Sequence, residues 1–350
     1  MRSLLVTGGA GFIGANFVLH WLSSHREDRV VVLDALTYAG NRANLAPAEG
    51  NGRYRFVHGD ICARAAVEAL LRAEAIDTIV HFAAESHVDR SILAPDTFIR
   101  TNVLGTQALL EAARTVWLKE RAVPAHLFHH VSTDEVYGSL RPRDPPFSER
   151  TPYAPNSPYS ASKAAADHLV RAYHHTYGLH TTTSNCSNNY GPLQFPEKLI
   201  PLTILKILAG EAVPVYGDGS NVRDWLHVSD HCRGIELILA RGRPGEVYNL
   251  GGECERRNID LVRTLCAIID TRVAASAALR ARYPRTPAAR AARSESLITY
   301  VTDRPGHDYR YAMDIGKARA ELGFEPELTA DRGFQQVVDW YLEHGARRGS

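Results

Sequence analysis

The chain has few cysteines and no excess of either charge, and each shortage excludes a class of protein. Its five cysteines form no CxxC pair, so we expect neither a disulfide framework nor a zinc site. We expect reduced thiols in a cytoplasmic protein instead. Lys and Arg number 40 against 39 Asp and Glu, so net charge gives no reason to expect a nucleic acid or a membrane as partner. We find no apolar run long enough for a membrane span, and the first residues do not resemble a signal peptide.

The first half of the chain alternates short apolar runs with helical patterns. Strand-like runs lie at 4–7, 30–33, 54–57, 78–82, 126–131 and 179–186. Helical patterns lie between them at 11–22, 65–73, 97–116 and after Ser157-Pro158, where Ser is a good N-cap. This alternation predicts an α/β fold with a doubly wound parallel sheet of the Rossmann type. Ligands then bind at the carboxyl ends of the strands.

The second half is less regular and predicts a smaller domain of mixed α/β structure. We expect residues 1–187 to form a dinucleotide-binding domain, with 222–250 returning to it. Residues 188–221 and 251–350 are expected to form a substrate-binding domain at the C-terminal side. The segment 274–293 is rich in Ala and Arg, contains two prolines and shows no amphipathic face, so we interpret it as a surface insertion.

A glycine-rich turn follows the first predicted strand. Gly8, Gly11 and Gly14 are spaced GxxGxxG, which allows a tight turn and a close approach of backbone to a pyrophosphate at a helix N-terminus. Asp34 lies 20 residues further on, at the end of the second strand, where an acid binds the adenosine ribose and repels a 2′-phosphate. Ala35 supplies no cation for such a phosphate, so the pattern favours NAD over NADP. Taken alone, the motif also fits an unrelated glycine-rich turn, and Asp34 a solvated loop acid.

Two further groups of residues can carry chemistry. Tyr159 and Lys163 form a YxxxK pair on one helix face, so the ammonium can hold a ribose and lower the pKa of the phenol. Thr133 follows the fifth strand and can bond to a substrate oxygen. The adjacent Asp134 and Glu135 can supply an acid and a base if their surroundings push their pKa values apart. Two turn acids at a strand end are the plainer interpretation of this pair.

Together these motifs resemble the extended short-chain dehydrogenase/reductase family, and longer segments resemble its dTDP-glucose 4,6-dehydratases. The segments are AAESHVDR (83–90), STDEVYG (132–138), 185–192, FPEKLIP (195–201), 221–227 and DRPGHD (303–308). The resemblance covers nearly the whole chain except 274–293. Ala35 departs from the Lys found in many members, but Asp34 is retained.

The resemblance implies dehydration of dTDP-glucose to a 4-keto-6-deoxy sugar nucleotide. It implies that Tyr159 takes the proton of the 4-hydroxyl while NAD accepts the C4 hydride. Glu135 then removes the C5 proton, Asp134 protonates the leaving 6-hydroxyl, and the hydride returns to C6. Because NAD is not consumed, we expect it to stay tightly bound.

The resemblance also implies a set of binding residues. For NAD they are Gly8, Gly11, Phe12, Ile13, Gly14, Asp34, Leu36, Thr37, Asp60, Ile61, Ala83, Ala84, Ser86, Thr101, Tyr159, Lys163 and Asn189. For the sugar nucleotide they are His87, Thr133, Asn188, Lys198, Leu199, Pro214, Tyr216, Arg223, Asn258, Asp303, Arg304 and His307. Arg223 suits the diphosphate best, since a guanidinium can make paired bonds, although a surface ion pair with Asp224 or Asp230 is an equal alternative without the family context.

Other interpretations compete with this one. A UDP-sugar 4-epimerase or a UDP-glucuronate decarboxylase has no use for the Asp134–Glu135 pair, and a silent NAD-binding regulator has no use for Tyr159 and Lys163. Thymine and uracil differ by one methyl group, worth only about 1–3 kcal/mol, so spacing does not identify the base. We expect no metal site, because the histidine pairs lack further ligands. The helices at 97–116 and 158–177 are expected to pair in a homodimer, as the family implies.

Overall fold

The computed structural model describes residues 1–120 and 125–345, so the last five residues of the expected C-terminal domain lie outside it. Its centre is a parallel sheet of order β10-β6-β5-β4-β1-β2-β3. These strands are β1 Ser3–Thr7, β2 Arg29–Asp34, β3 Tyr54–His58, β4 Thr78–His81, β5 Leu127–Thr133, β6 Thr181–Cys186 and β10 Val247–Leu250. The doubly wound sheet predicted from the sequence is therefore confirmed.

The order of the strands reverses beside β1. The chain runs outward from β1 to β2 and β3, then crosses back to β4 on the other side of β1. Thr7 at the end of β1 is consequently paired with Leu33 on one side and His81 on the other. Such a reversal opens a crevice at the carboxyl ends of the strands, where ligands of this fold class bind.

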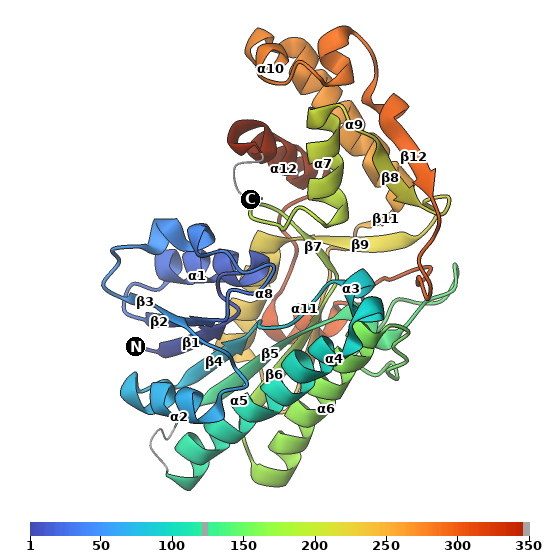
Figure 1. Ribbon diagram of the computed structural model, residues 1–350. Coiled ribbons are helices and arrows are strands. Elements are labelled where there is room, and N and C mark those ends of the chain that lie inside the picture. The colour runs from blue at the N-terminus through green and yellow to red at the C-terminus, as the bar shows by residue number, and fades with distance from the viewer. Residues whose placement is uncertain (121–124, 346–350) are drawn as a thin grey trace.

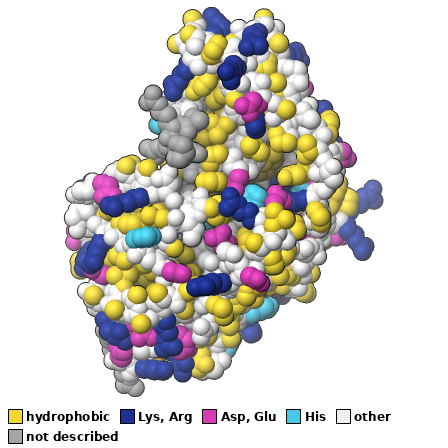
Figure 2. All heavy atoms as spheres, viewed as in Figure 1, with side chains coloured by type: hydrophobic (Ala, Val, Ile, Leu, Met, Phe, Trp, Pro, Cys, Tyr) yellow, Lys and Arg dark blue, Asp and Glu magenta, His cyan; other side chains and the backbone are white. Residues whose placement is uncertain are grey.

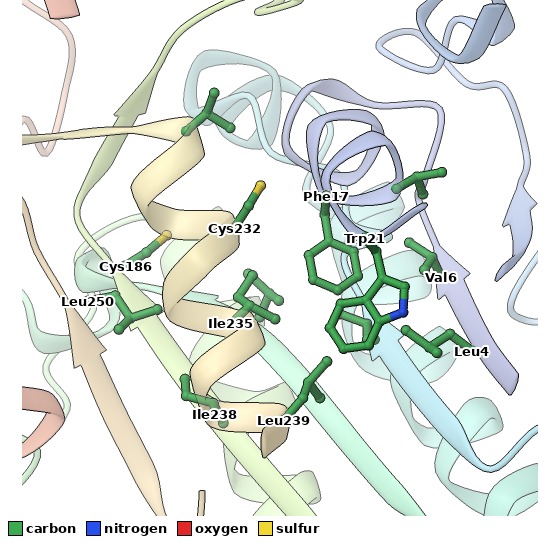
Figure 3. Packing of buried hydrophobic residues seen from close by; sticks show 14 of the residues in the cluster. Leu4, Val6, Phe17, Trp21, Cys186, Cys232, Ile235, Ile238, Leu239 and Leu250 are labelled. Atoms are coloured by element: carbon green, nitrogen blue, oxygen red, sulfur yellow. The ribbon is translucent and has the colours of Figure 1, made fainter. Parts of the chain in front are cut away.

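Helices cover both faces of the large sheet (Figure 1). Helices α1 (Phe12–Ser24) and α8 (Val228–Arg241) cover one face, with α11 (Gly316–Leu322) against α8 and β10. Figure 3 shows Phe17 and Trp21 of α1 lying between the side chains of β1 and those of α8. The other face carries α2 (Arg64–Ala73), α5 (Thr106–Ala113) and α6 (Pro158–Tyr177) around a second apolar cluster. Strand residues alternate between the two clusters, which is why both faces had to be apolar.

The predicted helix at 97–116 is confirmed as part of one unbroken helical run, but its geometry changes along the run. Helix α4 (Pro95–Phe98) begins the run, and π-helical segments η2 (Ile99–Gly105) and η3 (Arg114–Lys119) flank α5. A separate short helix, α3 (Val88–Leu93), precedes it. The predicted start of α6 is confirmed, because the Ser157 side chain accepts from the backbone of Ser160 in a capping box. Two 3-10 turns, η1 (Arg42–Ala48) and η4 (Asp134–Tyr137), follow β2 and β5 along the chain.

A second body stands above the carboxyl edge of the sheet (Figure 1). It holds a small sheet of β7 (Asn188–Tyr190), β9 (Val222–His227) and β11 (Glu255–Arg257), and a pair, β8 (Val213–Tyr216) with β12 (Ile298–Val301). Its helices are α7 (Leu199–Ala209), α9 (Asn258–Ala275), α10 (Ala277–Arg282) and α12 (Ala330–His344), with 3-10 turns η5 (Pro287–Arg290) and η6 (Ser294–Leu297). No helix among the described residues has the length and hydropathy needed to cross a membrane.

One expectation about this half needs correction, and a second is confirmed only in part. Strand β9 does not return to the large sheet with β10, but pairs with β7 and β11. The reason is that its side chains serve two cores: Trp225 packs in the core of the second body and Leu226 in that of the large sheet. The segment 274–293 does lie at the surface, since α10 buries none of its residues, but it is packed onto the second body rather than standing apart from it. It forms α10 and η5, Ala288 is buried in the core of the second body, and Tyr283 Oη donates to Leu342 O at 2.9 Å.

Candidate active site

The glycine turn after β1 leaves no room for side chains. A Cβ atom on Gly8, whose φ is +69°, would lie 2.6 Å from the backbone nitrogen of Ala83. A Cβ atom on Gly14 would lie 2.3 Å from the carbonyl oxygen of Gly8. The turn therefore brings the start of α1 against the ends of β1 and β4, and leaves backbone open to a ligand at the helix N-terminus. These contacts fit a dinucleotide pyrophosphate.

Asp34 is the last residue of β2, the strand next to β1, and so lies at the carboxyl edge of the sheet beside the glycine turn. One carboxylate oxygen accepts from the backbone nitrogen of Ala10 at 2.9 Å and the other from that of Leu36 at 2.8 Å. Burial raises the pKa of Asp34, and these two bonds oppose the shift. The carboxylate is thus fixed at the lip of the glycine turn, where it suits the hydroxyls of a ribose and disfavours an added phosphate.

One cleft along the carboxyl edge collects the predicted cofactor residues. Its lining includes all of them except Leu36, from the glycine turn through Asp34 to Thr101 and the Tyr159–Lys163 pair. The backbone of Leu36 holds Asp34, while its side chain packs against the apolar core below. The roles of the lining residues stay predictions, but the cleft joins an adenosine end to a catalytic end, as an extended dinucleotide requires.

Tyr159 and Lys163 lie together at the inner end of the cleft. Both side chains are buried on α6, and the Lys163 ammonium donates to the carbonyl oxygen of Val131 at 2.8 Å. Burial, and next the charge of Glu135, raise the pKa of Tyr159 well above its usual range, while a bond with Thr133 opposes the shift. The net shift is opposite to the lowering that we expected from Lys163, because burial outweighs the other influences on the phenol.

Asp134 and Glu135 have different surroundings although they are neighbours. Asp134 is 2% exposed, and one of its oxygens accepts from Thr133 Oγ1 at 3.2 Å. Burial raises its pKa well above the usual range, and Glu135 and Asp224 add to the shift. Burial also raises the pKa of Glu135, but the charges of Arg304, Lys198 and Arg223 oppose it. Asp134 is therefore held as a neutral acid, while Glu135 is closer to a carboxylate.

The predicted sugar-nucleotide residues divide into those in the cleft and those near its mouth. Thr133, Asn188 and Lys198 line the cleft, and Lys198 Nζ donates to Ser86 O at 3.1 Å. Tyr216 contacts Asp89 at 3.3 Å and Arg304 lies 3.5 Å from the same carboxylate. In Figure 2 basic, acidic and histidine side chains gather where the two bodies meet.

Further predicted residues extend this mouth cluster. His307 contacts Asp303 at 2.6 Å. His87 lies 3.4 Å from Glu197, and burial, with the Lys198 charge next, lowers its pKa to about 4. Burial, with the Arg304 charge next, also lowers the pKa of His307 to about 4, so both histidines are neutral near pH 7. Four predicted side chains remain outside the cleft lining and this cluster: Leu199, Pro214 and Asn258, at the starts of α7, β8 and α9, and Arg223 on β9.

Arg223 is buried and makes no surface ion pair with Asp224 or Asp230. Its guanidinium donates to the carbonyl oxygens of Val222 at 2.7 Å and Asp308 at 2.9 Å. Asp224 instead accepts from the backbone of Gly252 and Cys254, and Asp230 contacts Arg233 at 3.2 Å. The Arg223 charge acts on both Asp134 and Glu135, so it lies close to the catalytic end of the cleft.

A set of residues in contact with one another lies along the cleft, and we call it the loop clasp: Tyr38, Ser86, Arg90, Phe195 and Glu197. Sequence reasoning predicted Ser86 as a cofactor residue and missed the other four. Tyr38 Oη lies 3.2 Å from Ser86 Oγ, and its ring meets that of Phe195 edge-on at 5.7 Å. The Arg90 guanidinium stacks 4.1 Å from the centre of the Tyr38 ring and lies 3.8 Å from the Glu197 carboxylate. Tyr38 follows the strand that ends at Asp34, and that position was the available signal.

The residues present fit NAD and offer no site for a metal. Within the described ranges no group of three His, Cys, Asp or Glu side chains is placed to hold a metal ion. The cleft does fit a dinucleotide: it has a glycine cradle that any Cβ would fill, a fixed acid for a ribose, and buried Tyr159 and Lys163 at the other end. All five cysteines are free thiols.

Comparison with known proteins places this cleft in a family. The family model for GDP-mannose 4,6 dehydratase matches residues 5–337. A dTDP-glucose 4,6-dehydratase of Xanthomonas campestris (strain B100) is 59% identical over 98% of this chain and 93% of its own length. One from Escherichia coli is 50% identical over 97% of this chain and 94% of its own.

Solved structures agree with the sequence matches. The dTDP-glucose 4,6-dehydratase of Streptomyces venezuelae, solved with NAD bound, superposes with a TM-score of 0.87 at 47% identity, covering 98% of this chain and 97% of that one. A UDP-glucose 4-epimerase of Thermotoga maritima, solved with UDP-glucose, reaches 0.82 at 26% identity, covering 98% and 99%. The fold is thus shared with a UDP-glucose 4-epimerase, whereas the two curated relatives at 50–59% identity are dTDP-glucose 4,6-dehydratases. The chain belongs to the GDP-mannose 4,6 dehydratase family, among whose members it is similar along nearly its whole length to dTDP-glucose 4,6-dehydratases.

Proposed function

We propose that the protein is an NAD-dependent hydro-lyase that converts dTDP-glucose to dTDP-4-keto-6-deoxy-glucose. The observation that carries the proposal is the Asp134–Glu135 pair beside Thr133 and Tyr159 in one buried cleft. Oxidation and reduction at C4 alone need no second acid and base. Elimination of water needs both, and here the pair has one member held neutral and the other faced by cations.

The residues divide the reaction between them. Tyr159, bonded to Thr133, takes the proton of the glucose 4-hydroxyl as the phenolate. Because burial raises the pKa of this phenol, the step requires the Lys163 ammonium on the same helix face and the positive charge that bound NAD would add. NAD, which the glycine turn, Asp34 and Lys163 would hold, would supply the hydride acceptor for C4 and the hydride donor for C6. The 4-ketone makes the C5 proton acidic, so Glu135 can remove it and return it later. Asp134 donates its proton to the departing 6-hydroxyl, which leaves as water.

The proton balance of this scheme closes within the site. Tyr159 gains one proton from the 4-hydroxyl in each turnover, and Asp134 loses one to water. Thr133 contacts both residues and donates to Asp134 at 3.2 Å. Its hydroxyl therefore lies between Tyr159, which gains a proton, and Asp134, which loses one. The site then regains its starting protonation without a net exchange with solvent.

The test is incubation of the purified protein with dTDP-glucose, with product followed by mass for loss of water and by proton NMR, which distinguishes 4-epimers of equal mass. We expect loss of one water with the wild type and little product with Glu135→Gln, because an amide cannot take the C5 proton. UDP-glucose serves as the matched substrate, differing in the base. Conversion of UDP-glucose to its 4-epimer without loss of water, and no turnover of dTDP-glucose, would replace the dehydratase by an epimerase. Retained NAD without turnover of either substrate would favour a regulator.

We also propose that the protein acts as a homodimer in the cytoplasm. Large apolar side chains are exposed on α3, η2 and the end of α6, namely Leu93, Ile99, Leu104 and Tyr177. Exposed apolar groups on adjacent helices are typical of a covered interface. Light scattering during gel filtration should give twice the chain mass for the wild type. Leu104→Glu should shift it toward one chain, and Tyr300→Ser, at an exposed aromatic residue on β12 of the second body, should not.

A further inference from the structure

One buried carboxylate beside the catalytic residues has no part in the scheme above. Asp167 lies one helical turn after Lys163 on α6 and is 6% exposed. One of its oxygens accepts from Ser132 Oγ at 2.8 Å and from Tyr153 Oη at 2.9 Å. The other lies 3.0 Å from His130 Nε2. A carboxylate removed from water is costly unless it is paired, so these partners indicate a built position rather than a chance one.

The same carboxylate helps to fix the end of β5. Helix α6 is tied to this strand twice, by Lys163 Nζ to Val131 O at 2.8 Å and by Asp167 to the Ser132 hydroxyl. Asn185 Nδ2 extends the network, reaching both Tyr153 Oη and Thr133 O at 3.3 Å. The network thus holds the residue before Thr133 and the backbone of Thr133 itself, directly behind the reacting groups.

The carboxylate of Asp167 influences the protonation of Lys163. Burial lowers the pKa of Lys163, and the Asp167 charge is the largest influence that opposes it, followed by Cys186. Burial raises the pKa of Asp167 to about 6, opposed first by Lys163, so it remains a carboxylate near pH 7. His130 is kept neutral, because burial and the Lys163 charge lower its pKa.

The remaining titratable groups near Asp167 carry no fixed charge of comparable effect. His168 follows it on α6 and slightly favours its charged form. Tyr153 lies on the loop before α6 and Tyr137 on η4, and burial raises the pKa of both phenols, so they stay neutral. Cys186 on β6 stays a thiol for the same reason. Lys163 and Asp167 are therefore the pair of opposite charges in this part of the core.

We propose that Asp167 is a positioning residue, the counter-ion that keeps Lys163 protonated and in place for oxidation at C4. The inference rests on the proposed function, since it concerns the step in which Tyr159 takes the 4-hydroxyl proton. Residues four apart on a helix share a face, so the carboxylate and the ammonium lie on the same side of α6, each bonded to the end of β5 rather than to the other. Without the carboxylate, a buried ammonium in this site would give up its proton at lower pH.

The experiment compares wild type with Asp167→Asn, which keeps the side-chain shape, and Asp167→Glu, which keeps the charge. Rapid mixing of each NAD-loaded enzyme with dTDP-glucose, over a range of pH, measures the rate at which bound nicotinamide is reduced. This rate precedes the elimination and so does not depend on the later proton transfers. A second readout uses no substrate: the rate at which bound NAD is released, again against pH.

We expect the alkaline limb of the reduction rate to move down by about 1–3 pH units in Asp167→Asn, as removal of a close opposite charge shifts a pKa. Asp167→Glu should keep the wild-type limb. Release of NAD should accelerate with pH in Asp167→Asn only, because a neutral Lys163 holds a ribose less well. Ser132→Ala, which removes a partner of Asp167 but no charge, should lower rates equally at all pH.

Two results would overturn the inference. One is an Asp167→Asn profile with unchanged limbs, whatever the loss in rate, since this would mean that Asp167 only supports the fold. The other is a limb shifted equally in Ser132→Ala, since charge would then not be the cause. Failure of the wild type to reduce its nicotinamide with dTDP-glucose would instead contradict the proposed function, and the NAD-release profile would still test Asp167.

Discussion

Replacing Asp134 by Asn tests the division of labour in the site. Asn has the shape of a neutral carboxylic acid, and Asp134 is buried with its pKa raised well above the usual range. Thr133 Oγ1 can still donate to the side-chain oxygen, as it does at 3.2 Å in the wild type. The substitution therefore removes an acidic proton and little else. Thermal unfolding should show a midpoint close to that of the wild type.

The size of the expected loss follows from the role. General acid catalysis contributes about 10²–10⁴-fold, so kcat should fall by that factor, or about 2.7–5.4 kcal/mol in activation free energy. Oxidation at C4 does not use Asp134, so the variant should hold reduced nicotinamide after mixing with dTDP-glucose. Glu135 also remains, so the C5 proton should still exchange with deuterated water. Glu135→Gln is the matched control, with reduced nicotinamide but no exchange.

The pH dependence of wild-type turnover tests the same assignment of Glu135 as base and Asp134 as acid. Glu135 must be deprotonated, so activity should fall as pH drops through its raised pKa. Asp134 must be protonated, so activity should fall as pH rises through its own, higher pKa. Product mass, nicotinamide absorbance and deuterium content measure these outcomes. Wild-type turnover in Asp134→Asn, or loss of nicotinamide reduction along with turnover, would refute the assignment of Asp134 as the acid of the elimination.

Three further changes have expected outcomes of their own. Gly14→Ala should abolish NAD retention through gel filtration, because its Cβ would lie 2.3 Å from a backbone oxygen, whereas Gly52→Ala, with nothing within 4 Å, should retain it. Tyr38→Ala, which opens the loop clasp, should speed NAD release; an unchanged release rate would show that the clasp does not retain the cofactor. Phe17→Ala should lower the free energy of unfolding by about 3–5 kcal/mol in urea titration, against about 0.5 or less for the exposed Tyr300→Ala.

The parts of the fold that the sequence predicted are those set by local pattern. The glycine turn, Asp34 and the Tyr159–Lys163 pair each depend on spacing over a few residues next to an apolar run. The cap at Ser157 depends on three residues. These signals are short-range, so they could be interpreted without knowing which distant segments meet.

The parts that could not be predicted depend on long-range contacts. Strand β9 has apolar residues that suit either sheet, and only the placement of Trp225 and Leu226 in different cores decides its partners. Arg223 looked equally like a surface residue, because its carbonyl acceptor at Asp308 is 85 residues away. Tyr38 and Glu197 meet through loops more than a hundred residues apart, and the raised pKa of Tyr159 comes from burial by the whole fold.

The cleft between the two bodies has a consequence for how the folded chain is maintained. A cofactor returned unchanged in every turnover has no need to exchange, and the loop clasp, whose residues come from three separate segments of the chain, favours its retention. A ligand that binds only the native state adds RT ln(1 + [L]/Kd) to stability, about 4.1 kcal/mol when its concentration is 1,000 times Kd. Strand β9 couples the cores on either side of this cleft. The NAD concentration around the protein would then help set its lifetime against unfolding and proteolysis, even when no sugar nucleotide is present.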